Sequence, residues 1–248
     1  MTDALNLFSS DFALVVGLGA ILVGAVVQGS LGFGMGLVSI PILALMVPER
    51  LPQALVIASV PHTILMLARE RHGLRPRALS WLVVGRLAGI VPGIAILAVA
   101  SARSLQVLFA CVTLAAVGLM SMDRLALRIT PLSQLAAGTL SGFGGAAAGL
   151  GGPPVALLYA DQDGPALRTT LSAIMLAGNA VMILGYALTD RLTPIDVWTT
   201  LLFTVPVLSG LAIGMAVRSR LDGPRLRVAV LVLVFASGLV LLVRAVFG

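Results

Sequence analysis

Three polar side chains that could bind an anion lie inside long apolar stretches of the sequence. Arg86 stands in WLVVGRLAGIVPG, His62 in ASVPHTILM and Asn179 in MLAGNAVMI. A guanidinium can neutralise an oxyanion and hydrogen-bond it, an amide can donate to the same oxygens, and an imidazole can also carry a proton. Simpler roles stay open: Arg86 could snorkel to the end of its apolar stretch, and the other two could bond a neighbouring helix.

Two glycine-rich segments could supply backbone N–H groups to the same anion. LGFGMGLVSIPIL covers Leu31–Leu43 and AGLGGPPVALL covers Ala148–Leu158. Glycine permits unusual backbone angles, and a proline pair suits the first turn of a new helix, whose N-terminus attracts anions. The alternative use of membrane glycines is close helix packing. The glycines concerned are Gly32, Gly34, Gly36, Gly149, Gly151 and Gly152.

The composition places these residues in a membrane protein. The chain has 248 residues, of which 59% are hydrophobic and 10% charged, and its mean hydropathy is +1.09. A soluble domain of this size does not need so much apolar surface, whereas a polytopic membrane protein does. The net charge of +6 comes from arginines in short clusters between apolar runs. This pattern is typical of cytoplasmic loops and not of a nucleic-acid-binding surface.

The sequence lacks the motifs of enzymes and metalloproteins. His62 and His72 are its only histidines, and no HExxH, P-loop or nucleophile elbow occurs. Cys111 is its single cysteine, which excludes an internal disulfide and a cysteine-based metal site. We therefore predict that the protein is not an enzyme and that it uses no cofactor and no metal.

The apolar residues form eight runs. About 20 residues span a bilayer as a helix, so six runs fit one crossing each. The first and the fifth run are too long for one crossing and are interrupted by glycine. Irregular backbone at membrane depth is tolerated where it is buried in protein or lines a watery cavity. The runs are Phe12–Val47, Leu51–Ala68, Leu79–Ala100, Leu105–Met122, Leu132–Ala160, Leu167–Leu188, Val197–Val217 and Leu226–Val246.

A weak internal repeat relates the two halves of the chain. A shift of 117 residues pairs Trp81 with Trp198, the only two tryptophans, and also pairs His62 with Asn179. We predict one membrane domain over residues 1–248, with one repeat at 12–122 and the other at 132–246. The same register gives the pairs Gly32 and Gly149, Gly34 and Gly151, Pro48 and Pro165, and Gly93 and Gly210.

The arginines predict that the two halves face opposite sides of the membrane. Four arginines from Arg69 to Arg77 lie in the middle of the first half, and four from Arg218 to Arg227 lie late in the second. Short loops rich in arginine stay in the cytoplasm. Inversion requires an odd number of crossings per half, so each over-long run would hold two short crossings or a re-entrant broken element. Eight plain helices in parallel repeats are the alternative.

These patterns together predict an all-α polytopic membrane protein of two homologous halves, arranged as inverted repeats. Each half would carry a glycine-rich broken or re-entrant segment, and the two segments would meet at mid-depth around one polar cavity. Gln28, Ser30, Ser39 and Ser59 are weaker candidates for this site, since serine can bond its own helix backbone. The predicted substrate-binding residues are Gly32, Gly34, Gly36, His62, Arg86, Gly149, Gly151, Gly152 and Asn179.

The two glycine-rich segments resemble the motif of the sulfite exporter TauE/SafE family, also called toluene-sulfonate uptake permeases. That motif is a Gly-x-Gly-Gly-Gly run followed by apolar residues and proline, once per half. The first copy here lacks one glycine of the triplet, and in the second copy Pro153 replaces the third glycine. VPGIAILA at Val91–Ala98 and LSGLAIGMA at Leu208–Ala216 are similar to a later family segment.

The resemblance implies a multi-pass protein of the bacterial inner membrane that transports a small anion. Sulfite, organosulfonates and related sulfur-containing or carboxylate anions are the expected substrates. The resemblance does not fix the direction of transport, and export is our expectation. Two halves that face opposite sides of the membrane favour alternating access as the mechanism. An anion channel and a membrane scaffold without transport are the alternatives. The expected partners are the anionic substrate and the lipid bilayer, with no nucleic acid, and a homodimer is left open.

Overall fold

The structure is a computed structural model of the chain. It describes residues 10–47, 51–69, 79–121, 127–221 and 224–247, without the side chains of residues 218–227. Throughout this part of the chain every regular element is a helix. The helices are α2 (Asp11–Leu31), α3 (Met35–Leu43), α4 (Gln53–Arg69), α5 (Ser80–Val99), α6 (Ala102–Ser121), α7 (Pro131–Ala148), α8 (Gly152–Leu158), α9 (Gly164–Leu188), α10 (Pro194–Leu221) and α11 (Pro224–Phe247).

Six of the described helices are long and apolar enough to cross a membrane, namely α2, α5, α6, α9, α10 and α11. The predicted all-α polytopic class is therefore confirmed. One detail differs from the pattern of apolar runs. The run Leu51–Ala68 forms α4, which has only 17 residues, whereas the over-long first run contributes the spanning helix α2.

Each over-long apolar run folds as a long helix followed by a short one, and glycine separates the two. In the first, α2 ends where Gly32 takes a φ of 89°, and Gly34, with a φ of 122°, precedes α3. In the second, α7 ends where Gly149 takes a φ of 66°. These angles are open to glycine and strained for other residues. Met35 and Gly152, which begin the short helices, are one repeat length apart.

The short helices fold back along the long ones. Ser39 on α3 donates a hydrogen bond to the carbonyl of Ala20 on α2. In the second hairpin, Gln134 near the start of α7 donates to the hydroxyl of Tyr159, which directly follows α8. Each over-long run is therefore a helical hairpin whose second arm is short.

Helices of one half pack on helices of the other half. α5 lies parallel to α7, and Gly85 and Gly89 on α5 approach the α7 backbone so closely that a Cβ would overlap carbonyl oxygens there. α2 lies parallel to α10, where Gly210 and Gly214 approach the α2 backbone in the same way. Close helix packing is therefore the role of these glycines, as small residues serve in membrane helices generally.

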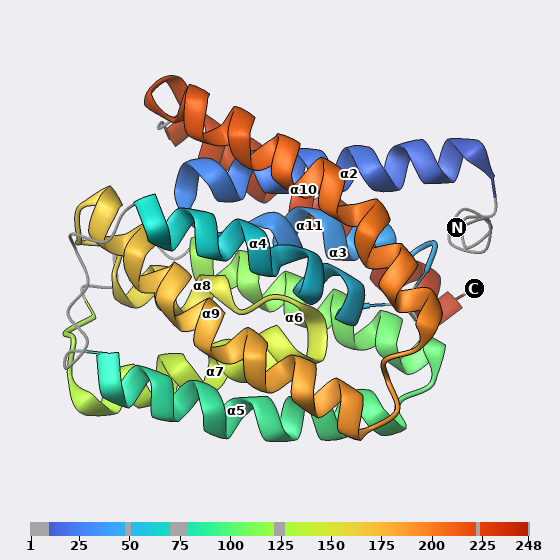
Figure 1. The fold of residues 1–248 in the computed structure, drawn as a ribbon, viewed down its shortest axis with the longest axis horizontal. Helices are drawn as coiled ribbons and strands as arrows, with labels where there is room; N and C mark the ends of the chain where they lie inside the picture. Colours follow the sequence, from blue (N-terminus) through green and yellow to red (C-terminus); the bar gives the residue numbers. More distant parts are fainter. Residues whose placement is uncertain (1–9, 48–50, 70–78, 122–126, 222–223, 248) are drawn as a thin grey trace.

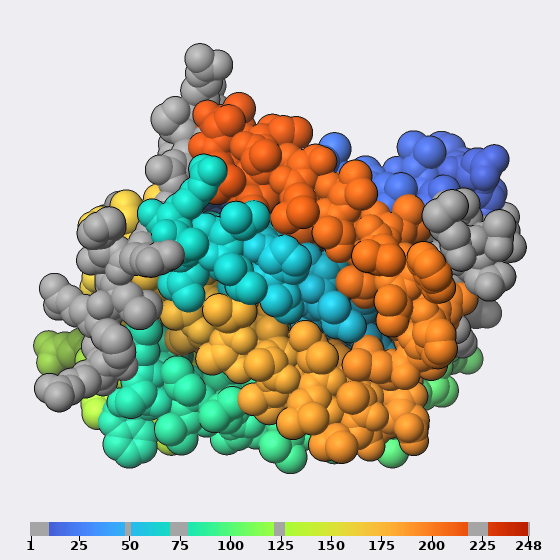
Figure 2. Space-filling model, in the orientation of Figure 1, coloured from blue at the N-terminus to red at the C-terminus, as the bar shows by residue number. Residues whose placement is uncertain are grey.

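The central helices α4 and α9 run antiparallel. Gln53 at the start of α4 bonds the carbonyl of Arg191 just beyond α9, and Ser59 further along α4 bonds Asn179. α6 and α11 are also antiparallel, because Arg103 bonds the carbonyl of Ala245 while Thr113 lies near Gly238. In Figure 1, α2 begins and α11 ends at the same end of the bundle. In Figure 2, α4 lies between α10 and α9 on the face shown.

Some residues used in the sequence argument lie outside the described part of the chain. Pro48 of the repeat pairs is one of them, and so are Arg71, Arg75 and Arg77 of the first arginine cluster.

Candidate functional site

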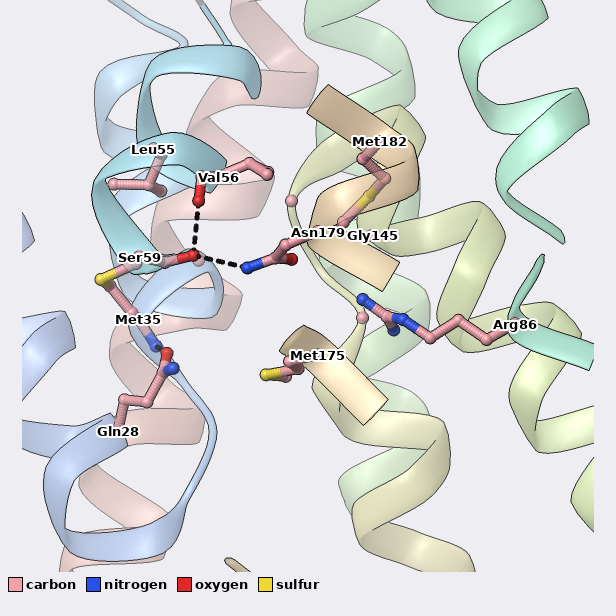
Figure 3. Close-up of a pocket in the computed structure, with 13 residues that line it drawn as sticks. Gln28, Met35, Leu55, Val56, Ser59, Arg86, Gly145, Met175, Asn179 and Met182 are labelled. Atoms are coloured by element: carbon pink, nitrogen blue, oxygen red, sulfur yellow. Dashed lines mark hydrogen bonds between the residues drawn. The ribbon is translucent and has the colours of Figure 1, made fainter. Parts of the chain in front are cut away.

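A small cavity lies where the two helical hairpins meet α4, α5 and α9. Its volume is about 50 Å³. Figure 3 shows Gln28 and Met35 on one side, Arg86 on the opposite side, and side chains of α4 and α9 between them. The lining residues are Gln28, Met35, Gly36, Leu55, Val56, Ser59, Arg86, Gly145, Gly149, Gly151, Met175, Asn179 and Met182.

The two glycine-rich segments are in contact beside this cavity. A Cβ on Gly36 would overlap the carbonyl oxygen of Gly149, and a Cβ on Gly152 would lie 2.7 Å from the Cβ of Phe33. Glycine at these positions is therefore required by the approach of one backbone to the other. The cavity has backbone from both halves of the chain in its wall.

Arg86 is buried in this wall, and its side chain is only 2% exposed. One terminal nitrogen donates to the hydroxyl and, at 3.3 Å, to the carbonyl of Ser141. That hydroxyl in turn donates to the carbonyl of Gly151. Nε of Arg86 has no hydrogen-bond partner, and none of the described carboxylates forms an ion pair with the guanidinium. Arg86 therefore does not snorkel, and its charge has no counter-charge in the described residues.

Three glycines leave the space that the guanidinium occupies. A Cβ on Gly178 would overlap Nε of Arg86, and a Cβ on Gly151 would lie 2.8 Å from a terminal nitrogen. A Cβ on Gly145 would lie 3.4 Å from the other terminal nitrogen. These glycines come from α7, from the second break and from α9. Larger residues at Gly151 and Gly178 would force the guanidinium to move.

Polar side chains of α4 and α9 line the cavity between Gln28 and Arg86. Asn179 donates from Nδ2 to Oγ of Ser59 at 3.1 Å, and Ser59 donates to the carbonyl of Val56 at 2.7 Å. Asn179 thus makes the helix–helix hydrogen bond expected of an isolated membrane amide, and it also lines the cavity.

Gln28 connects the first break to His62. Its Oε1 accepts a hydrogen bond from the N–H of Met35 at 3.1 Å, and this N–H is one of those in the first turn of α3 that have no partner within the helix. Its Nε2 lies 3.2 Å from Nδ1 of His62. His62 is fully buried and does not line the cavity, and its Nε2 has no hydrogen-bond partner.

The family model for the sulfite exporter TauE/SafE matches residues 16–241. The chain belongs to the sulfite exporter TauE/SafE family. It is therefore a multi-pass membrane protein of a sulfite and anion exporter type, and the family consists of transporters and not of enzymes. No curated protein and no solved structure matches the chain.

In this TauE/SafE protein, five of the nine residues expected at the site line the cavity: Gly36, Arg86, Gly149, Gly151 and Asn179. The other four do not line it. Gly32 is packed against Arg168, Gly34 against Val27 and Gly152 against Phe33, while His62 contacts Gln28.

Some residues that line the cavity of this protein were not predicted from the sequence. Met35, Met175 and Met182 face it, but a methionine in a membrane helix gives no signal that separates a cavity from lipid or core. Gln28 and Ser59 are only weak candidates for the site from the sequence, and for Ser59 the reason is that serine can bond its own helix backbone. Gly145, one repeat length after Gln28, also lines the cavity, but only the structure shows this.

The TauE/SafE cavity thus joins one buried cation to neutral donors, without a carboxylate in its lining. In the described part of the chain, no cluster of three metal-binding side chains occurs. The set of groups is suited to an anion, because the guanidinium carries a positive charge and the Asn179 amide has a second N–H beyond the one bonded to Ser59.

Proposed function

We propose that this TauE/SafE member is a secondary transporter that binds one small oxyanion in the cavity between its two breaks and carries it by alternating access. The observation that carries the proposal is the buried guanidinium of Arg86, which lines the cavity and whose charge has no described counter-ion. An unpaired buried charge costs several kcal/mol. An anion in the cavity offsets that cost.

The size of the cavity favours a small inorganic anion. A cavity needs roughly 10–15 Å³ to hold one water molecule. The observed volume of about 50 Å³ therefore corresponds to a few waters, or to one pyramidal or tetrahedral oxyanion such as sulfite. An arylsulfonate would need a wider cavity. We propose that small sulfur oxyanions and short-chain sulfonates are preferred over toluenesulfonate.

We propose that residues 12–122 and 132–246 are inverted repeats. Equivalent helices run in opposite directions at the two interfaces where they meet, between α4 and α9 and between α6 and α11. The two largest of the other interfaces form a matching pair, α5 with α7 and α10 with α2. A pseudo-two-fold axis perpendicular to the helices accounts for both facts. If the helices cross the bilayer, that axis lies in the membrane plane.

The hairpins support the odd number of crossings that inversion requires. α2 and α4 both lie parallel to α10, so they run in the same direction. The chain can do this only because α3 returns along α2 between them. A re-entrant arm thus lets each half begin on one side of the membrane and end on the other.

The arginine clusters then fall on one side. Arg69 at the end of α4 bonds the sulfur of Met215 near the end of α10, so the chain leaves both helices at the same end of the bundle. The segments rich in arginine follow these two helix ends. We propose that this end is cytoplasmic.

Counterflow in proteoliposomes tests the proposed function. Vesicles loaded with unlabelled sulfite should transiently accumulate labelled sulfite, and thiosulfate and methanesulfonate should compete better than toluenesulfonate. Arg86→Gln should raise the apparent KM for the anion at least tenfold. Arg244→Gln is the matched control, because Arg244 is an exposed arginine on α11 that bonds a carbonyl far from the cavity. Flux that shows neither saturation nor counterflow would identify a channel, and no flux at all would identify a scaffold.

A further inference from the structure

The hydrogen bonds between Met35, Gln28 and His62 specify one protonation state of the histidine. Oε1 of Gln28 accepts from the N–H of Met35, so the amide nitrogen must face His62. Nδ1 of His62 therefore accepts the bond from Gln28, and the imidazole is neutral with its hydrogen on Nε2. The opposite orientation of the amide would set its NH₂ group against the N–H of Met35, donor against donor.

Protonation of His62 breaks this arrangement. The imidazolium carries a hydrogen on both nitrogens, so Nδ1–H would point at the NH₂ group of Gln28. The amide must turn its oxygen to Nδ1–H, and the N–H of Met35 then loses its acceptor. That N–H lies at the N-terminus of α3, and Met35 and the next residue, Gly36, both line the cavity. One proton on His62 thus releases a backbone donor at the anion site.

The charged groups around His62 favour the proton only when an anion is present. Arg86 lies across the cavity from Gln28, and its positive charge opposes a second buried cation (Figure 3). Among the described charged residues of α2, α4, α9 and α10, none forms an ion pair or hydrogen bond with His62. These residues are Asp11 on α2, Arg69 on α4, Arg168 on α9 and Asp196 on α10. An anion in the cavity screens Arg86 and occupies the freed N–H.

We propose that a proton on His62 and the anion in the cavity bind cooperatively through Gln28, so that the proton is the ion coupled to transport. This inference rests on the proposed function and names its coupled ion. His62 is a positioning residue here, because it acts on the anion only through Gln28. By thermodynamic linkage, the proton raises the affinity for the anion and the anion raises the affinity for the proton by the same factor. Proton and anion then cross the membrane together, in the direction that their combined gradients set.

The test measures anion binding to the purified full-length protein in detergent between about pH 5.5 and 8, the range in which histidine titrates. Thiosulfate and methanesulfonate are the probes, because neither anion changes its own charge over this range, whereas sulfite does. The Kd of the wild-type protein should fall with falling pH, by up to about tenfold per unit where His62 is neutral in the free protein. Binding in weak buffer should take up as much as about one proton per anion.

Three variants test whether the pH dependence of anion binding comes from His62 acting through Gln28. His62→Gln keeps an acceptor for Gln28 but carries no proton, so it should bind the anion with a Kd that does not change with pH. Gln28→Ala keeps the histidine but removes the connection, and it should also lose the pH dependence. This second variant keeps the test decisive if His62→Gln does not fold. His72→Gln is the matched control and should keep the wild-type pH dependence, since His72 is the only other histidine of the chain.

The outcomes separate this inference from the proposed function. Wild-type binding without pH dependence overturns the proton coupling and leaves the anion site intact. A Kd that still depends on pH in both His62→Gln and Gln28→Ala also overturns the coupling, because another group would then carry the proton. Absence of binding by the wild-type protein at every pH overturns the proposed function, and the coupling with it.

Discussion

The backbone of Gly178 on α9 lies against Nε of Arg86 on α5, with no room between them for a single methyl group. The Arg86 side chain, which we assign to anion binding, therefore fits in this position only because residue 178 of the neighbouring helix has no side chain. Nε stays buried without a partner at this contact. This contact also closes Nε off from the cavity, so the terminal nitrogens are the donors left for an anion.

Gly178→Ala should weaken anion binding by displacing the guanidinium of Arg86. We expect the apparent KM for transport to rise about tenfold, which corresponds to about 1.4 kcal/mol. Alanine is the better helix former by about 1 kcal/mol, so α9 itself should not be weakened. Gly118→Ala on α6 is the control, because a Cβ there meets nothing within 4 Å. An unchanged KM in Gly178→Ala would mean that the position of Arg86 does not matter for the anion.

Arg86→Lys should restore only part of the transport that Arg86→Gln loses. Lysine supplies the charge, but its compact ammonium cannot bond Ser141 and present a planar fork to an oxyanion at the same time. We expect the apparent KM of the lysine variant to lie between those of the wild type and Arg86→Gln in the same vesicles. Equal KM values for lysine and arginine would reduce the role of Arg86 to its charge alone.

Gly151→Val should abolish transport without preventing membrane insertion. A Cβ at this position lies 2.8 Å from Arg86 and 2.9 Å from the carbonyl oxygen of Ser141, so valine would fill the cavity wall and push the guanidinium away. Size-exclusion elution in detergent checks folding, and counterflow checks transport. Gly19→Val on α2 provides the comparison, since a Cβ on Gly19 has open space. Transport by Gly151→Val at the wild-type rate would show that the anion passes elsewhere.

Cysteine labelling should give the same side of the membrane for residues 75 and 225. Cys111 is the only native cysteine, so Cys111→Ser provides the background. Arg75→Cys and Arg225→Cys should both react with an impermeant maleimide in inside-out vesicles and not in intact cells. The physical reason is the shared end of α4 and α10 together with the cytoplasmic retention of arginine-rich loops. Labelling from opposite sides would contradict the proposed orientation of the two halves in the membrane.

Local rules were enough to predict the positions of the breaks. Gly32 and Gly149 have positive φ angles, and glycine is the residue type that adopts such angles without strain. The second glycine-rich segment stands 117 residues after the first in the sequence. The sequence also shows Arg86 well inside an apolar run, where an arginine is costly, but it left open whether the side chain snorkels or turns into the protein.

The neighbours of these residues could not be predicted, since they are set by tertiary packing. Arg86 is held by Ser141 from the other half, and nothing near Arg86 in the sequence indicates that α5 packs on α7. The bond between Gln28 and His62 joins residues 34 positions apart on helices that other helices hold together. For this reason His62 was expected in the cavity wall and lies one layer behind it.

The packing of α5 on α7 and of α2 on α10 bears on how the protein is made. When α2 enters the bilayer, α10, which will pack on it, has not yet been translated. The glycine face of α5 likewise stays uncovered until α7 has been made. The first half therefore cannot complete its own interfaces, and assembly must finish after the second half has been inserted. Until then the glycine faces are open to other membrane helices, so premature termination of synthesis leaves a fragment prone to wrong association and degradation.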